Sequence, residues 1–210
     1  MGRTRLYEND AARVAAHRAR AKALRYADSV TLPDGVPDAT PGDEAYTLPR
    51  VITAARAALG AIDLDPASCA QAQTKVVQAT HWYGLDHPDP ACRNGLVLPW
   101  AGRVWLNPPF SDALPWARRL VNAYTTGAVS AAVLLISGDV STDYSQMLRP
   151  VAAASCWPQP RLQFWPRRML TNKRTGKVER SSPSFTAIVW YLGASPGRFI
   201  TAFAPIGDTR

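Results

Sequence analysis

The most constraining stretch of the sequence is Trp105-Leu106-Asn107-Pro108-Pro109-Phe110, in which two apolar residues run directly into two prolines. Because proline has no backbone N–H and a fixed φ, this pair stops both a helix and sheet pairing. The stretch therefore predicts a strand that ends at Leu106, followed by a stiff tip. In an open α/β sheet, ligands bind beyond the carboxyl ends of the strands. A tip with one amide and one aromatic ring suits a flat substrate that carries an amino group.

Apolar periodicity along the rest of the chain predicts helices and strands in alternation. The predicted segments are a helix at 47–59, a strand at 61–65, a helix at 67–81, a strand at 103–106, a helix from 112, and strands at 131–136, 156–164 and 185–192. This order is the α/β signature. Thr47 is expected to cap the first helix and Gly60 to end it, and Ile62 and Leu64 are expected to share one face of the strand that follows. The unbroken apolar run at 131–136 is typical of a strand covered on both faces, as in a parallel sheet.

The spacing of the two strand ends limits the size of the sheet. Pro66 to Leu106 is 41 residues, and one strand–helix–strand unit takes about 30 or more. At most one further strand fits between the ends. We therefore expect a shortened, doubly wound, Rossmann-like sheet with helices on both faces.

The charge pattern divides the chain and indicates its partner. A net charge of +8 points toward a polyanion, and no apolar run is long enough to span a bilayer. Residues 1–29 read as a basic N-terminal helix or arm, either simply solvated or in contact with phosphates. Residues 30–43 are rich in Pro and Gly and read as a linker. The folded domain is expected at 44–210.

The three cysteines give no disulfide or metal pattern. Their number is odd and no pair has C-x-x-C spacing, so a reducing cytoplasm is the simplest setting. Cys69, His81, His87 and Cys92 lie near one another in the sequence, but their spacing matches no common zinc site. We predict no bound metal.

Several short motifs follow one another in a defined order between Tyr46 and Tyr191. They are Tyr46-Thr47-Leu48-Pro49, Ile62-Asp63-Leu64-Asp65-Pro66-Ala67-Ser68, Trp82-Tyr83, Gly95-Leu96, Pro99-Trp100, Arg103-Val104-Trp105-Leu106 with the Asn-Pro-Pro-Phe tip, Thr142-Asp143-Tyr144 and Arg161-Leu162-Gln163-Phe164. In this order they resemble the phage-type, Dam-like family of DNA N6-adenine methyltransferases. The resemblance implies a methyltransferase-type sheet and S-adenosylmethionine as the cofactor. It also implies a cytoplasmic protein, in the host cytoplasm if a phage encodes it.

The resemblance assigns the catalytic role to the tip. The side-chain oxygen of Asn107 and the carbonyl of Pro108 would accept the two N–H groups of an adenine amine. Pro109 would fix the turn, and Phe110, where many relatives carry Tyr, would stack on the base. The substrate would be double-stranded DNA with the target adenine flipped out of the stack. No membrane and no obligate protein partner is expected.

Two further sets of residues are candidates for cofactor and DNA contact. The candidate cofactor-binding residues are Tyr46, Thr47, Pro49, Asp63, Asp65, Pro66, Ala67 and Ser68. The candidate DNA-binding residues lie in a basic segment at 161–183 with a hairpin-like tip at 171–177, and are Arg161, Arg167, Arg168, Lys173, Arg174, Lys177 and Arg180. Cationic charge interleaved with aromatic rings suits phosphate contact and stacking.

Two alternatives stay open from the sequence. The tip chemistry also fits methylation of another amino group, on RNA adenine or protein glutamine. The chain lacks the G-x-G loop that follows the cofactor strand in many methyltransferases, and this favours a DNA-binding module that has lost catalysis. Read alone, Asp63 and Asp65 also fit ordinary turn carboxylates.

Overall fold

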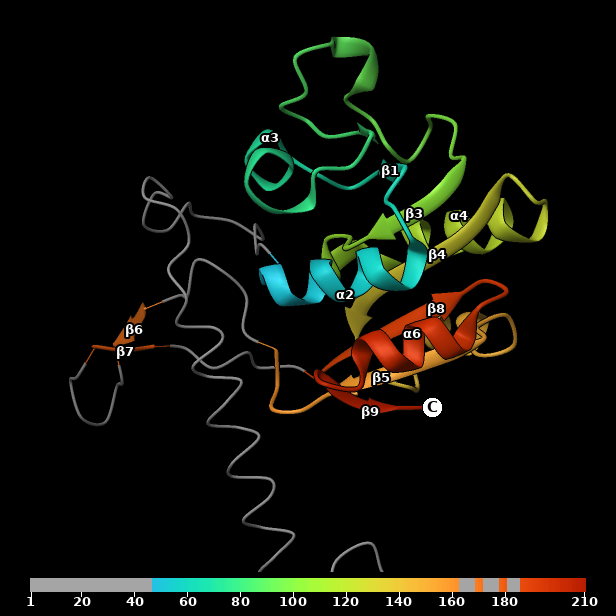
Figure 1. Cartoon of the computed structure of the whole chain (residues 1–210). Helices are drawn as coiled ribbons and strands as arrows, with labels where there is room; N and C mark the ends of the chain where they lie inside the picture. The colour runs from blue at the N-terminus through green and yellow to red at the C-terminus, as the bar shows by residue number, and fades with distance from the viewer. Residues whose placement is uncertain (1–46, 163–168, 172–177, 181–185) are drawn as a thin grey trace, which may run out of the picture. The chain divides into compact units, whose positions relative to one another are not determined.

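The computed structural model describes residues 47–162, 169–171, 178–180 and 186–210. Within these residues, seven strands form one sheet. They are β1 (Leu64–Asp65), β2 (His81–Trp82), β3 (Gly102–Leu106), β4 (Val129–Ser137), β5 (Ala154–Pro158), β8 (Ala187–Leu192) and β9 (Gly207–Thr209), in the order β2-β1-β3-β4-β8-β5-β9 (Figure 1). The predicted arm at 1–29 and linker at 30–43 lie outside the described residues.

The sheet is mixed rather than wholly parallel. β1 pairs in parallel with β2 and β3, and β3 with β4, whereas β8 runs antiparallel to both β4 and β5. β5 and β9 are also antiparallel. The expected α/β architecture is present, and the mixed seven-stranded sheet is consistent with a Rossmann-like fold. The expectation of parallel neighbours for 131–136 is wrong on one side of β4. A continuous apolar run reports burial on both faces, which is independent of strand direction.

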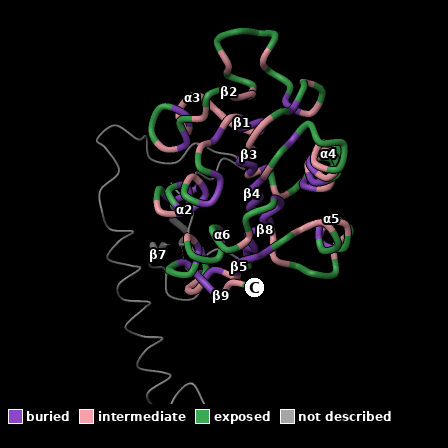
Figure 2. Tube along the Cα trace, turned by 45° about the vertical axis from the view of Figure 1, so that its right-hand side comes forward, coloured by how far each residue is buried: buried purple, intermediate pink, exposed green. Residues whose placement is uncertain are grey.

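Helices cover both faces of the sheet. α2 (Pro49–Leu59) and α6 (Pro196–Phe203) lie on one face, and α4 (Ala113–Thr125) and α5 (Asp143–Leu148) lie on the other (Figure 2). Each face has its own apolar cluster, the first around α2 and α6 and the second around α4. β8 is buried along its whole length, and most residues of β4 and β5 are buried, so these central strands supply much of the apolar area that stabilises the fold.

The remaining helical segments are short and lie in the connections. They are α3 (Ala70–Ala72), the π-helical η1 (Gln73–Val77), and the 3₁₀ turns η2 (Pro90–Cys92) and η3 (Phe110–Asp112). The helix predicted at 67–81 is thus confirmed at 70–77 only. No described helix is long and apolar enough to cross a membrane.

The start of α2 differs from the sequence expectation in one respect. Thr47 was expected to cap the helix, but the N-cap residue is Leu48, with no side-chain cap bond. The Thr47 hydroxyl is engaged elsewhere, with Asn107. The expected end is confirmed, since Gly60 follows the helix at φ 88°, a left-handed conformation that favours glycine.

The strands that flank the connections are shorter than expected. Sheet pairing in β1 covers only Leu64 and Asp65, and Ile62 packs in the first cluster while Leu64 packs in the second. The expectation that Ile62 and Leu64 share a face is therefore wrong. β5 ends at Pro158, before the predicted end at 164, because Pro158 and Pro160 cannot donate to a ladder.

Candidate functional site

The carboxyl ends of β1 and β3 lie side by side at the point where the strand order reverses. From β1 the chain moves to β2 on one side and then returns to β3 on the other. Leu64 pairs with Val104, so Asp65 lies level with Trp105, and Asn107 follows directly on the end of β3. In α/β sheets the crevice at such a reversal is the usual ligand site. The one extra strand allowed by the sequence is β2, at the sheet edge.

Asn107 is held by the chain that enters α2. Its amide Nδ2 donates to the Thr47 hydroxyl oxygen at 3.1 Å, and Thr47 is itself only 8% exposed. The Asn107 Oδ1 atom is buried and accepts no hydrogen bond from the described residues. A buried carbonyl without a donor costs roughly 1–3 kcal/mol, so this atom is a natural acceptor for a bound N–H group.

The rest of the tip frames that oxygen. Pro108 is buried, Pro109 is exposed, and Phe110 is half-buried against the first apolar cluster. Immediately after Pro109 the chain turns through η3 into α4. The tip is thus fixed at both ends, by β3 before it and by helical structure after it.

Asp65 is the most deeply buried carboxylate of the predicted cofactor set. It is 2% exposed, accepts a hydrogen bond from Gln73 Nε2 at 2.8 Å, and receives the Ala67 N–H at 3.4 Å. Desolvation raises its pKa to about 7, against the opposing effect of hydrogen bonds from Ser68, Ala67 and Gln73. No cation among the described residues pairs with it, which leaves a carboxylate suited to polar donors of a ligand.

Gln73 organises the turn that follows β1. Its amide nitrogen bonds Asp65 and also the Ser68 hydroxyl at 2.7 Å, while its carbonyl accepts the Ala79 N–H at 2.9 Å. This role has no local signal in the sequence, because a single Gln within a predicted helix is an ordinary surface residue. Only its burial, at 7% exposure, distinguishes it.

Asp63 is not brought together with Asp65 and Asn107. Its carboxylate accepts the backbone N–H of Arg103 at 2.8 Å and forms a two-pronged salt bridge with the Arg103 side chain, each contact at 2.7 Å. The Arg103 guanidinium holds the pKa of this carboxyl below its usual range. Asp63 therefore lies at the amino end of β3 with its acceptors already used.

Two glycines bring the long loop at 84–101 against the turn after β1. A Cβ at Gly84 would overlap the carbonyl oxygen of Ser68, and one at Gly95 would overlap that of Pro66. Trp100 fixes the same loop by donating from its indole nitrogen to the Gly95 carbonyl at 2.7 Å. The backbone of 66–68 is thus positioned by close contact rather than by a G-x-G loop of its own.

Gly95→Ala should destabilise the fold by about 1–3 kcal/mol, because the added methyl overpacks the loop against Pro66. Gly197→Ala is the matched control, since a Cβ there meets no atom of the described residues within 4 Å and Ala favours the helix. Urea unfolding at constant slope measures both free energies. An unchanged midpoint for Gly95→Ala would show that the loop does not hold the turn.

The basic segment at 161–183 is described only in part. Arg161 is exposed, and Arg180 lies in β7 (Val178–Arg180), which pairs antiparallel with β6 (Met169–Thr171) as the predicted hairpin requires. The cofactor candidate Tyr46 lies outside the described residues. So do the remaining DNA-binding candidates, Arg167, Arg168, Lys173, Arg174 and Lys177. Ser137 pairs with Ala187, and Cys156 pairs with Val189. β5 therefore ends, and β8 begins, at the same end of the strands as Asn107.

Comparison with known proteins assigns no family to this chain. No protein-family model and no curated protein matches the sequence. Among the described residues, no group of three or more His, Cys, Asp or Glu side chains could hold a metal ion. The geometry and chemistry of the site are therefore what indicate a function.

Proposed function

We propose that this protein is an S-adenosylmethionine-dependent DNA methyltransferase that acts on the exocyclic N6 amine of a flipped adenine. The observation that carries the proposal is the buried Oδ1 of Asn107, at the end of β3 and beside the Asp65 turn, which accepts no hydrogen bond from the part of the chain that the structure describes. An acceptor that lacks a donor suits an amine substrate. The ordered motifs between Tyr46 and Tyr191 support adenine as that substrate.

The tip has the groups needed to orient an aromatic amine. Its nitrogen is a poor nucleophile because the lone pair is delocalised into the ring. Asn107 Oδ1 and the Pro108 carbonyl would each accept one N–H, in a geometry that frees the lone pair toward the methyl donor. Positioning of this kind accounts for much of catalysis when no covalent nucleophile is used. Phe110 offers a ring face for the base.

The residues after β1 fit the cofactor. Asp65 presents a buried carboxylate with no cationic partner among the described residues, and ribose hydroxyl or ammonium donors would satisfy it. Pro66, Ala67 and Ser68 continue the turn beside it. When bound, S-adenosylmethionine supplies the electrophilic methyl group. Asp63 is left out of this set because its carboxylate already forms a salt bridge with Arg103.

Charge and topology support DNA as the polymer. The net charge of +8 favours a polyanion. The basic segment at 161–183 begins and ends at the edge that carries Asn107. The end of β5 and the start of β8, which flank this segment, therefore lie where a base would be presented. An enzyme of this kind would act in the cytoplasm, where bacterial and phage DNA is found.

Nucleoside mass spectrometry tests the proposal. Duplex DNA incubated with the protein and S-adenosylmethionine should contain N6-methyladenine. Its absence while calorimetry shows cofactor binding would overturn the substrate assignment. Methylation of RNA or of a protein glutamine in the same assay would redirect it to that amino group. DNA binding without any cofactor binding would identify a lapsed module.

Thr47→Val should lower kcat by about 10–100-fold, because it removes the oxygen that fixes the Asn107 amide while keeping the side-chain shape. Thr47→Ser keeps the hydroxyl and should retain most of the activity. The KM for cofactor should be unchanged in both variants. A raised cofactor KM with normal kcat would instead place Thr47 in the cofactor site, as the sequence motif implies.

A further inference from the structure

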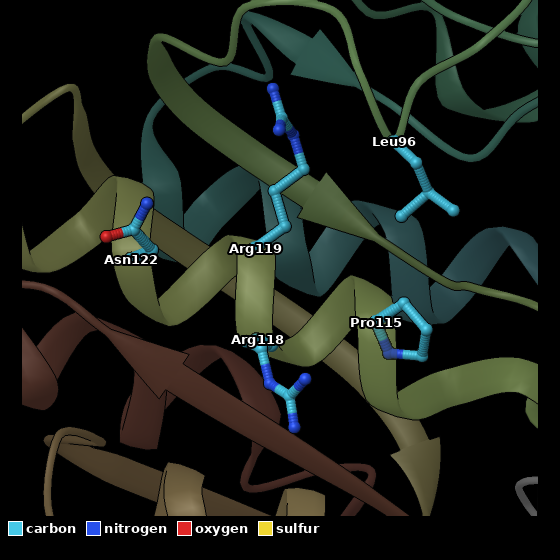
Figure 3. A pocket seen from close by; sticks show the side chains of 5 residues that line it. All are labelled: Leu96, Pro115, Arg118, Arg119 and Asn122. Carbon is cyan, nitrogen blue, oxygen red and sulfur yellow. The ribbon is translucent and has the colours of Figure 1, made fainter.

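A groove with two cations lies along α4, away from the residues that the motifs single out. It has a volume of about 580 Å³ and is lined by Leu96, Pro115, Arg118, Arg119 and Asn122 (Figure 3). Its lining contains two guanidinium groups and one amide, and no acid. A groove with this lining favours an anionic ligand.

Arg119 is held rigidly in this groove. Its guanidinium lies over the Trp100 ring, 5.4 Å from the centroid, and donates to the Leu98 carbonyl. Trp100 in turn stacks on Trp116, with centroids 6.2 Å apart. The Arg119 Nε is buried and has no acceptor among the described residues. These contacts fix the orientation of the guanidinium, so its positive charge stays at the groove.

Arg118 differs from its neighbour in being exposed. Figure 3 shows the two arginine side chains leaving α4 in different directions. A single phosphate would be gripped by converging guanidinium groups. Diverging groups instead suit separate phosphates along one strand, which recur about every 3.4 Å of the duplex axis.

The position of α4 connects the groove with the tip. The helix begins at Ala113, just after Phe110, and Arg118 is about 8 Å along its axis at ~1.5 Å per residue. Side chains on a helix tilt toward its N-terminus, which here is the Asn107 end. A polynucleotide that presents a base to the tip would carry its backbone past these arginines.

We propose that Arg118 and Arg119 form a phosphodiester-binding groove that holds the nucleic-acid backbone beside the nucleotide at the tip. This groove is separate from the basic segment at 161–183. The identity of the polymer as DNA rests on the proposed function. The guanidinium pair and its place beside the tip do not depend on it.

The test is Arg118→Gln, measured by fluorescence anisotropy on a labelled duplex without cofactor over a range of salt concentrations. The variant should bind several-fold more weakly at low salt, and the slope of log K against log[salt] should flatten by about 0.9, the loss of one phosphate contact. Arg149→Gln is the matched control, because Arg149 is exposed after α5 and at the opposite end of the sheet from Asn107. It should keep the affinity and slope of the unaltered protein.

The outcomes separate this inference from the proposed function. An unchanged affinity and slope for Arg118→Gln would overturn the groove, whether or not the protein methylates DNA. A flattened salt slope for Arg118→Gln, with no N6-methyladenine formed by the unaltered protein, would overturn the proposed function but support the phosphodiester-binding groove. Calorimetry with inorganic phosphate at constant ionic strength should show no saturable binding. Saturable binding lost in Arg118→Gln, with DNA binding intact, would reassign the groove to a small phosphate ligand and overturn the proposal.

Discussion

Asn107→Ala should reduce methyl transfer by about 10²–10³-fold in kcat, similar to the loss of one oriented hydrogen-bonding group at a reacting centre. The substitution removes one of the two acceptors for the amine. Cofactor affinity should be unchanged, because the Asp65 turn lies on the neighbouring strand. Rates of methyl incorporation into duplex DNA at saturating cofactor measure the effect.

Two variants separate the chemistry from the fold. Asn107→Asp keeps an acceptor oxygen in the same shape and should retain more activity than Asn107→Ala. Asn94→Ala changes an exposed amide in the loop and should be close to normal. The free energy of unfolding of Asn107→Ala should not fall much, because the alanine removes a buried carbonyl to which no described residue donates. Undiminished activity in Asn107→Ala would rule out the mechanism.

The sequence predicted the middle of the sheet better than its edges. β3, β4 and β8 are apolar runs bounded by proline, glycine or charge, and their burial dominates the pattern. β1 and β2 have two residues each, too few for any period to be read. The direction of β8 was not predictable, since parallel and antiparallel strands buried on both faces have the same composition.

The candidate site was predicted in outline by chain length. The 41 residues between Pro66 and Leu106 leave little room between the two strand ends, and β1 and β3 are indeed neighbours. What the sequence could not separate was Asp63 from Asp65. Their difference comes from Arg103, 40 residues away, whose guanidinium engages one carboxylate and not the other.

Long-range contacts also explain the residues that were missed. Gln73 and Arg119 stand in ordinary helical sequence. The first acts through Asp65 and Ser68, and the second through the Trp100 ring. Neither contact has a local signal, because each joins segments that only the fold brings together. The sequence motif identified Thr47 as a candidate, but its hydroxyl accepts a hydrogen bond from Asn107 and does not cap the helix that follows it.

Asp65→Asn should make the protein more stable at pH 8 and at the same time weaken cofactor binding. Desolvation raises the folded-state pKa of Asp65 from 3.8 to about 7, so the fold favours the protonated form. Below pH 4 the group is protonated in both states and has no effect. Between pH 4 and 7 stability falls as pH rises, and above pH 7 the cost levels off on the order of 4 kcal/mol.

Cofactor binding should depend on pH in the opposite sense. Hydrogen-bond donors of S-adenosylmethionine favour the ionised carboxylate, so cofactor affinity should increase as pH rises through 7. At pH 8 the affinity of Asp65→Asn for the cofactor should be about 10–100-fold lower, which corresponds to one charge-assisted hydrogen bond. Asp63→Asn is the matched control: it breaks the Arg103 salt bridge, and stability should fall, but cofactor affinity should not. Urea unfolding and calorimetry from pH 5 to 8 measure both quantities. If Asp63→Asn weakened the cofactor and Asp65→Asn did not, the carboxylate assignment would be reversed. The ionised Asp65 carboxylate lowers the stability of the fold but binds the cofactor. Asp65→Asn should therefore raise the free energy of unfolding and weaken cofactor binding at the same time.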